Sequence, residues 1–434
     1  MRSLNFFSSL VGVPLVAVAL RDRKRSSTYY QPDSSFECVL STPNRCMKTR
    51  IYHSIRPIVF LLDPETAHAA ALITGQSVAH LYFLSVQFLQ AIESFLEWSA
   101  DSIFGPSHFP PPAPPSPSRL TNTVCGIQFT RPCGISAGFD KNGKLGNLFN
   151  SHILSIGHAE IGSVSYGPWL GNPKPRLFRL VPDRAIINRM GLNNDGSAVV
   201  ASRLSRLESS SASTVRLGIN ITKTPDPLIE GKDAVQDFVK SLEFMQHLQA
   251  IHWITLNISC PNTAEGKTFE DTHALSDLLE AIAQHKRDKK IFLKLSPMRN
   301  TSDTKTDIIQ IAKKFKVDAL VIANTVPDRN FALKSHPSLV QQKGGLSGPL
   351  LLERSIQLIE QGFKRGFTVI GVGGISSGQD AYKLMRRGAS LIQLYTAIVY
   401  DGPFVLDDIH NGLERCLLID GYRNVSEIIG KDLE

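Results

Sequence analysis

The sequence predicts an α/β protein whose main domain is an eight-stranded parallel (β/α)8 TIM barrel. From about residue 119 onwards, short apolar runs typical of buried strands alternate with amphipathic helical patterns. Eight such units in roughly 300 residues are typical of a closed parallel barrel. The alternative is an open doubly wound sheet, which expects a glycine-rich turn after its first strand. The first strand here ends in Ser136-Ala137-Gly138-Phe139-Asp140-Lys141, which is not that turn.

The composition is ordinary for a globular protein, with 42% hydrophobic and 20% charged residues in a chain of 434. The formal charge of +8 is unevenly placed, because residues 1–56 hold nine Lys or Arg and three Asp or Glu. The rest of the chain is near neutral, so nothing indicates a nucleic-acid partner. The six cysteines form no CxxC pair and no zinc-like spacing with His. We therefore expect reduced thiols and no metal site.

Residues 1–30 are expected to be a targeting or membrane-anchor segment. Residues 4–20 are mostly apolar, and a basic run at 21–25 follows. Seventeen residues are near the short limit for a membrane span. A secretory signal peptide, an organelle leader and a single anchor held by the basic run remain open interpretations.

A small N-terminal helical domain is predicted for residues 51–105. Asp63-Pro64-Glu65 marks a helix start, with an N-cap, a proline at the first position and an acid in the first turn. Residues 77–104 are rich in large apolar side chains, which either pack on a core or form an apolar entrance facing lipid. The seven prolines of residues 106–118 predict an extended linker, followed by the barrel domain at 119–434.

Within the barrel domain a hairpin at Val124–Phe129 precedes the repeating units. The predicted strands are Cys133–Ala137, Ala159–Val164, Leu217–Ile221, His252–Ile258, Ile291–Leu295, Ala319–Ala323, Val369–Val372 and Leu391–Leu394. Helical patterns between them include Asp233–Leu248, His273–His285, Asp303–Phe315, Leu350–Phe363 and Gly378–Arg387.

Polar side chains gather where these strands end, which is where such barrels carry their chemistry. Buried amides need hydrogen-bond partners. A group of asparagines there favours a small planar ligand rich in C=O and N–H groups: Asn188, Asn193, Asn257, Asn262 and Asn324.

Two further features favour a phosphorylated redox group. The turns at 344–348 and 371–374 are rich in glycine, and the second opens a helix whose N–H groups could hold a phosphate. Glycine is common in such turns, so each signal alone is weak. Lys294 ends the fifth strand with no acid adjacent in sequence. A buried cation there suits a ligand that becomes anionic, as a flavin does on reduction.

The segment 256–263 joins the fourth strand to a loop that carries a thiol. Asn257 and Ser259 share a face of the strand, and Cys260 follows. Amides beside a thiol can fix a flat polar ligand and place an acid/base group next to it. The alternative is a strand end with an incidental buried cysteine.

These motifs resemble the membrane-bound, quinone-linked (class 2) dihydroorotate dehydrogenases, which are flavoproteins of pyrimidine biosynthesis. The resemblance extends from about Tyr52 to the C-terminus, apart from the Pro-rich insertion. The motifs that carry it are Asp63-Pro64-Glu65 with His68, Ala137–Lys141, Asn172–Arg176, Asn188–Gly191, Asn257–Ser259, Gly344–Gly348, Gly371–Gly374 and Gln393–Thr396.

The resemblance implies FMN as cofactor, (S)-dihydroorotate as substrate, orotate as product and a membrane quinone as acceptor. The FMN contacts that it implies are Ser136, Ala137, Gly138, Lys141, Ser163, Asn220, Asn257, Lys294, Ala323, Gly348, Gly373, Gly374, Tyr395 and Thr396. The implied substrate contacts are Lys141, Asn188, Arg189, Met190, Gly191, Leu192, Asn193, Asn257, Asn262, Asn324 and Thr325. The implied quinone tunnel includes His68, Arg179 and Tyr395.

The chain departs from this class at the catalytic base, where Cys260 stands in place of the usual serine. A cysteine there is typical of the soluble class 1 relatives. The resemblance implies that Cys260 removes the C5 proton while a hydride leaves C6 for flavin N5. A thiol has a pKa of about 8.5, so it needs less activation than a serine hydroxyl to act as a base. Val59 appears where the class has a tunnel glutamine.

The resemblance also implies a single N-terminal anchor in the lipid of the mitochondrial inner membrane. Two alternatives remain for the function. One is a related flavin barrel that uses another dihydropyrimidine, or fumarate or NAD as acceptor. The other is an inactive anchored binding protein.

Overall fold

The computed structural model describes residues 47–81, 118–151, 153–207, 215–259, 269, 271–297 and 302–434. They belong to one compact unit, Asn44–Glu434. The predicted anchor segment 1–30 and the Pro-rich residues 106–117 lie outside the described residues, so both remain predictions. No helix in the described ranges is long and apolar enough to cross a bilayer.

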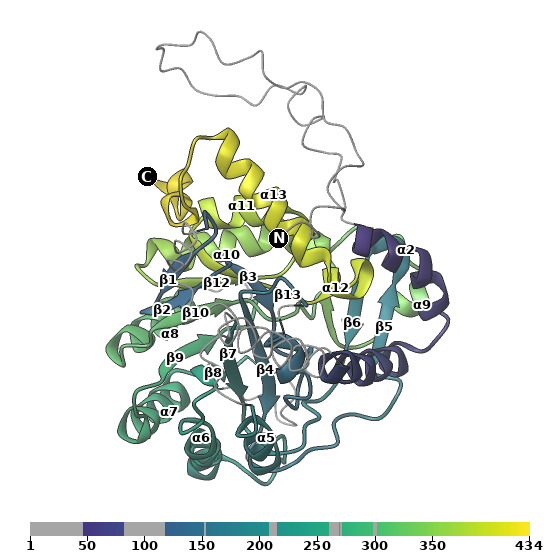
Figure 1. Cartoon of the computed structure of the whole chain (residues 1–434). Helices are drawn as coiled ribbons and strands as arrows, with labels where there is room; N and C mark the ends of the chain where they lie inside the picture. The colour runs from purple at the N-terminus through teal and green to yellow at the C-terminus, as the bar shows by residue number, and fades with distance from the viewer. Residues whose placement is uncertain are drawn as a thin grey trace, which may run out of the picture. The chain divides into compact units, whose positions relative to one another are not determined.

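Eight parallel strands form a closed barrel, which confirms the predicted fold (Figure 1). The strands in chain order are β3 Cys133–Ile135, β4 His158–Val164, β7 Arg216–Ile221, β8 Ile251–Asn257, β9 Lys290–Lys294, β10 Ala319–Ile322, β12 Val369–Val372 and β13 Ala389–Leu394. The helices that follow them are α4 Gly146–Phe149, α5 Ser197–Leu204, α6 Gly231–Met245, α7 Thr272–His285, α8 Ser302–Lys314, α10 Leu352–Lys364, α11 Gly378–Arg386 and α13 Val405–Ile419. Around the barrel the strands follow the order β10-β12-β13-β3-β4-β7-β8-β9.

Several strands end one or two residues earlier than the apolar pattern predicts. The fourth predicted strand extended to Ile258 and the fifth to Leu295, whereas β8 ends at Asn257 and β9 at Lys294. Ile258 and Leu295 remain buried after the ladder ends. Because hydrophobicity reports burial rather than strand pairing, it does not mark these ends.

A three-stranded antiparallel sheet lies outside the barrel and was not predicted (Figure 1). It is built from β5 Leu177–Leu180, β6 Ala185–Asn188 and β11 Gly345–Ser347, in the order β11-β6-β5. β11 belongs to the excursion between β10 and α10, far along the chain from its partner β6. Strand pairing over this separation leaves no local signal in the sequence. The sheet has its own small apolar core, which includes Leu180, Ile187 and Leu346.

Helix α2, Met47–Val59, docks on α12, Thr396–Asp401, which directly follows β13. The Tyr52 hydroxyl donates to the Val399 carbonyl at 2.7 Å, and the Arg56 guanidinium donates to the Tyr400 carbonyl at 3.0 Å. His53 Nε2 lies 2.9 Å from a carboxylate oxygen of Asp401. These contacts hold α2 next to the carboxyl end of β13.

The second N-terminal helix covers residues 64–81 and begins as predicted. Asp63 Oδ1 accepts from the backbone N–H groups of Glu65 and Thr66, both at 3.1 Å. One face packs on the barrel domain: a Cβ placed on Gly75 would meet Leu145 at 2.9 Å and Leu148 at 3.1 Å. The helix therefore approaches these two leucine side chains closely at Gly75.

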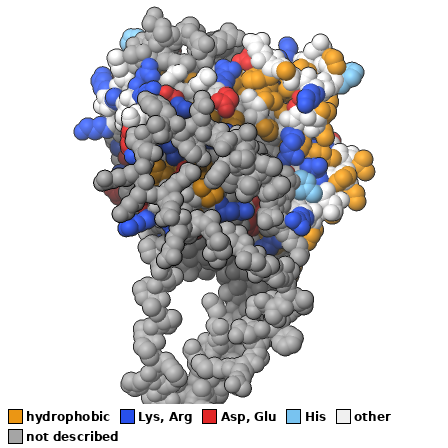
Figure 2. Space-filling view, turned by 90° about the horizontal axis from the view of Figure 1, so that it is seen from above, with side chains coloured by type: hydrophobic (Ala, Val, Ile, Leu, Met, Phe, Trp, Pro, Cys, Tyr) orange, Lys and Arg blue, Asp and Glu red, His pale blue; other side chains and the backbone are white. Residues whose placement is uncertain are grey.

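Large apolar side chains on these two helices remain exposed. Figure 2 shows hydrophobic and basic side chains together on the side where Figure 1 places α2. Exposed examples from these helices and the turn between them are Ile51, Ile55, Ile58, Leu61, Leu62, Ile73, Val78 and Leu81. An exposed apolar surface of this kind is typical of an interaction face.

Aromatic side chains close the amino end of the barrel. Phe129 from the hairpin β1 Asn122–Val124 and β2 Ile127–Phe129 packs against Trp253, with ring centroids 6.0 Å apart. Trp253 stacks on Phe292 at 5.6 Å. The amino end is therefore a packed apolar plug, and open space occurs at the opposite end.

Candidate functional site

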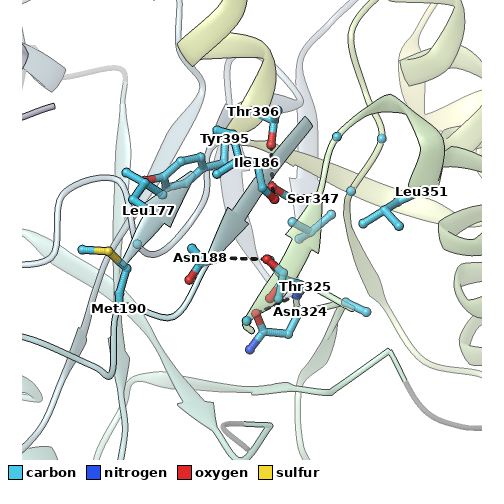
Figure 3. A pocket seen from close by; sticks show the side chains of 18 of the residues that line it. Leu177, Ile186, Asn188, Met190, Asn324, Thr325, Ser347, Leu351, Tyr395 and Thr396 are labelled. Atoms are coloured by element: carbon cyan, nitrogen blue, oxygen red, sulfur yellow. Dashed lines mark hydrogen bonds between the residues drawn. The ribbon is translucent and has the colours of Figure 1, made fainter. Parts of the chain in front are cut away.

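A cavity of about 590 Å³ lies at the carboxyl ends of the barrel strands (Figure 3). The last residues of β8, β9 and β12 line it, namely Asn257, Lys294 and Val372. The three-stranded sheet supplies one wall through Leu177, Ile186 and other residues. The predicted site residues that line the cavity are Ala137, Gly138, Lys141, Ser163, Asn188, Met190, Gly191, Leu192, Asn257, Lys294, Ala323, Asn324, Thr325, Gly348, Gly373, Gly374, Tyr395 and Thr396.

A row of hydrogen-bonded polar side chains crosses three strand ends. Asn257 Nδ2 donates to Ser163 Oγ at 2.9 Å, and Asn257 Oδ1 accepts from the Ser259 hydroxyl at 2.8 Å. Asn324 Nδ2 then donates to Ser259 Oγ at 2.9 Å. Each amide is fixed by at least one neighbour, so the row is a preorganised polar surface. Ser259 was not predicted as a site residue, although it shares a strand face with Asn257.

The sheet wall adds a second pair of polar groups. Asn188 Nδ2 donates to the Gly345 carbonyl at 3.4 Å, and Asn324 Oδ1 accepts from the Thr325 N–H at 2.8 Å. Figure 3 shows Asn188, Asn324 and Thr325 close together on one side of the pocket. These amides come from β6 and from the end of β10, which the fold brings together.

Glycine turns keep another side of the cavity open. Gly348 has φ +133°, and a Cβ there would lie 2.9 Å from the Ala185 Cα atom. Gly374 has φ +88°, and its Cβ would lie 2.4 Å from the Leu352 backbone. Both positions therefore require glycine. Beside them the Thr396 hydroxyl donates to Ser347 Oγ at 2.9 Å, which leaves small polar groups next to open backbone.

Lys141 places a second lysine on the cavity wall, and its surroundings are strongly charged. Burial and the neighbouring Arg176 guanidinium lower the pKa of Lys141 to about 8, while Glu65 acts against them. Arg176 makes a paired contact with Glu65, at 3.1 Å from Nε and 2.7 Å from an Nη atom. Arg176 also donates to the carbonyls of Leu170 and Asn172. Glu65 belongs to the helical segment 64–81, so an N-terminal helix helps to set the charge of Lys141.

His68, predicted for a quinone tunnel, reaches the cavity wall through Phe139. Its Nε2 lies 2.8 Å from the Phe139 carbonyl oxygen, so Nε2 carries the proton. Burial and the nearby Lys141 lower the pKa of His68 to about 4, so the ring is neutral at pH 7. The Phe139 ring contacts His68 at 5.1 Å and Tyr395 at 5.6 Å. An aromatic path therefore connects the helical segment to Tyr395 on the cavity wall.

Some predicted site residues do not line the cavity. Arg179 donates to the Phe60 carbonyl at 3.1 Å and also to the Leu62 carbonyl, so it holds the turn after α2. Arg189 donates to the Pro175 carbonyl at 2.8 Å and to Gln342 Oε1 at 3.0 Å. Both guanidiniums are occupied by protein carbonyls.

Three other predicted residues lie close to the cavity without lining it. Ser136 is buried, and its N–H donates to the Leu394 carbonyl at 3.0 Å. Asn220 is fully buried beneath the cavity, and Asn193 Oδ1 has no partner among the described residues. Cys260 and Asn262 fall outside the described residues, so their roles remain predictions.

Arg329 is a wall residue that the sequence analysis missed. Its guanidinium donates to the carbonyls of Val340 at 3.1 Å and Gln342 at 2.9 Å. Further bonds reach the carbonyls of Val326, Pro327, Asp328 and Gly344. The Arg329 side chain therefore holds together the segment between β10 and β11 that forms this part of the cavity wall. An arginine before a long glycine-rich excursion was the available signal.

Together, the barrel, the amide row, the glycine turns and the two lysines define a pocket for a polar, anionic ligand, as in a cofactor-dependent barrel enzyme. A family model described as dihydroorotate dehydrogenase matches residues 119–417. The chain belongs to the dihydroorotate dehydrogenase family.

Relatives and solved structures agree with this membership. A dihydroorotate dehydrogenase (quinone) of Rhodopseudomonas palustris is 35% identical over 387 residues, covering 87% of this chain and 94% of the relative. The protein of the same name from Streptomyces avermitilis is 37% identical over 326 residues, covering 73% and 86%. The ligand-free DHODH of Eimeria tenella has a TM-score of 0.66 and 31% identity, covering 79% of this chain and 98% of that one.

The Arg329 contacts predict what a substitution there does. Arg329→Lys replaces a guanidinium that donates to six carbonyls with a single ammonium group, so residues 326–344 lose most of the hydrogen bonds that hold them together. We expect amide hydrogen exchange in residues 326–344 to accelerate by about tenfold or more. Arg365→Lys is the control, because the Arg365 side chain donates to the Gln361 carbonyl within its own exposed helix turn and to no other group among the described residues. Unchanged exchange in Arg329→Lys would contradict the assigned role.

Proposed function

We propose that this protein oxidises (S)-dihydroorotate to orotate with bound FMN and passes the electrons to a membrane quinone, a step of pyrimidine biosynthesis. The observation that carries the proposal is the hydrogen-bonded row Ser163–Asn257–Ser259–Asn324 beside two lysines in one cavity. The relatives named dihydroorotate dehydrogenase (quinone) support both the substrate and the acceptor.

The residues present fit FMN. Lys294 is buried and forms no ion pair within the described ranges, and burial lowers its pKa, so an anionic ligand would stabilise its charge. Asn220 Oδ1 and Gln393 Oε1 are buried acceptors without a partner in the described part of the chain. The turns at Gly348 and Gly374 leave backbone room for a phosphate. FMN, when bound, supplies the hydride acceptor.

The substrate is proposed to lie against the asparagine side chains. Dihydroorotate carries a carboxylate and cyclic amide groups, which match amide donors and acceptors in pairs. Asn188, Asn257, Asn324 and Thr325 supply these groups, and Lys141 supplies a cation for the carboxylate. Because the amides are already held by their neighbours, little side-chain entropy is lost on binding.

Cys260 is proposed as the base for the C5 proton. It directly follows Ser259, whose hydroxyl is held between Asn257 and Asn324. The strand end that leads into the cysteine is therefore fixed by the same amides that would hold the substrate. Cationic neighbours favour the thiolate over the thiol.

The N-terminal helices are proposed to guide the quinone. Their exposed apolar side chains suit contact with lipid, and neutral His68 with Phe139 offers an apolar route to Tyr395. We further propose that residues 1–30 anchor the chain in the mitochondrial inner membrane. The basic run after the apolar segment supports the anchor.

Steady-state rates with different acceptors test the proposed function. With dihydroorotate as donor, a short-chain ubiquinone analogue should be reduced faster than fumarate or NAD by more than about tenfold. The apolar helices and the His68 path give the reason, since fumarate and NAD are charged. Faster turnover with fumarate or NAD would contradict the quinone assignment.

Substitution of Cys260 tests the proposed base. Cys260→Ala should lower turnover by about 10²- to 10⁴-fold, because no group remains to take the proton. Cys260→Ser should retain more activity than the alanine variant. Cys125→Ala is the control, since Cys125 contacts Asp318 at the amino end of the barrel. An alanine variant with wild-type turnover would show that Cys260 is not the base.

The lowered pKa of Lys141, about 8, predicts how orotate binding depends on pH. Below this value the ammonium is charged and attracts the carboxylate; above it the charge is lost. The orotate dissociation constant should be flat below about pH 7 and rise by up to tenfold per pH unit above about pH 8. Lys141→Arg should remove this inflection, because a guanidinium stays charged. A wild-type constant that is flat to high pH would contradict the role.

A further inference from the structure

The layer of side chains at the floor of the cavity is polar, which is unusual inside a barrel. Branched apolar residues normally fill such a core. Here five strands each direct a polar side chain to the interior, with exposures of 5% or less: Glu160 from β4, Asn220 from β7, Thr255 from β8, Lys294 from β9 and Gln393 from β13. We call this set the polar layer.

The Glu160 carboxylate connects the members of this layer. One oxygen accepts from Asn220 Nδ2 at 2.7 Å. The other accepts from Thr255 Oγ1 and from Gln393 Nε2, both at 3.0 Å. Glu160 also acts electrostatically on Lys294 and favours its charged form. A single buried carboxylate therefore connects five strands of the barrel, its own included.

These hydrogen bonds fix which way the two amides point. Each amide turns its nitrogen to Glu160, so its oxygen must point elsewhere. Both oxygens, Asn220 Oδ1 and Gln393 Oε1, are buried without a partner in the described residues. In the ladder Asn220 lies opposite Gly162, two residues beyond Glu160 toward the cavity, and Gln393 lines the cavity itself. Two acceptors are thus available to a ligand N–H above the layer.

We propose that Glu160 is a positioning residue that turns the Asn220 and Gln393 carbonyls toward the cofactor and offsets the Lys294 charge beneath it. This inference rests on the proposed function, in which a flavin fills the cavity. The effect of Glu160 on the Lys294 charge should change the reduction potential of the flavin. A cation next to a bound flavin would stabilise its anionic reduced form, and a carboxylate that acts electrostatically on that cation would weaken the effect. Glu160 therefore holds the reduction potential below the value that Lys294 alone would set.

The reduction potential of Glu160→Gln holoprotein tests this inference. The substitution keeps the shape and removes the negative charge. The bound flavin should become easier to reduce, with at least a tenfold change in its reduced-to-oxidised ratio at fixed potential, which is about 30 mV for a two-electron couple. Equilibration with a redox dye measures it. An unchanged or lower potential overturns the inference.

Thr255→Val is the matched control. It removes one hydrogen bond to the same carboxylate but leaves the charge in place. Its potential should change much less than that of Glu160→Gln. Equal shifts in both variants would indicate a purely structural role and overturn the inference.

A second comparison applies if Glu160→Gln does not accumulate as folded protein. That variant leaves the Lys294 ammonium buried without its counter-charge, which is strongly unfavourable. The double variant with Lys294→Gln contains neither charge. The reduction potential of the double variant should exceed that of Lys294→Gln alone by at least about 30 mV, the same tenfold change in the reduced-to-oxidised ratio. Equal potentials overturn the inference.

The wild-type protein separates this inference from the proposed function. If it is purified without flavin and takes up no added FMN, the proposed function and the inference both fail. If it holds flavin but Glu160→Gln leaves the potential unchanged, only the inference fails.

Discussion

An ammonium group held inside a closed barrel constrains everything above it. Burial disfavours the charge of Lys294, and Glu160 only partly restores it. Removing one of two interacting buried charges leaves the other uncompensated, which is less favourable than removing both. The strand ends around Lys294 must therefore present a polar, ordered surface. The row from Ser163 to Asn324 and the carbonyls above Glu160 form that surface, and the cavity lies next to it.

The cavity has two kinds of neighbour, and they suit two different reactants. On one side lie the three-stranded sheet and the segment between β10 and β11, which Arg329 holds by hydrogen bonds, and together they enclose a polar space. On the other side the N-terminal helices dock through Tyr52 and Glu65, and they present apolar surface outward. The polar side suits a water-soluble reactant, and the apolar surface of the helices suits a lipid-soluble one. This division agrees with relatives named for a quinone.

The sequence was sufficient for the eight strands and for α6, α7, α8, α10 and α11, because each of these elements is strongly periodic and local. The short helices α4 and α5 were not among the predicted elements. It was also sufficient for the polar side chains at the strand ends, which converge in a barrel, but fewer than half of the residues that line the cavity were predicted. It was insufficient for β11, which pairs with β6 from a distant part of the chain. Glu160 was missed because it lies inside an apolar run, where a single carboxylate was the only signal. Arg189 adjoins a site asparagine in sequence, yet its guanidinium is turned to protein carbonyls, which only the folded chain reveals.

The central claim is that this cavity holds a flavin that takes electrons from dihydroorotate. The most direct measurement is the visible spectrum of the purified protein during anaerobic titration with dihydroorotate. We expect a yellow protein whose flavin absorbance bleaches in proportion to added substrate, close to one equivalent per site, and returns when a quinone is added. A colourless protein, or a flavin band that dihydroorotate leaves unchanged, would contradict it.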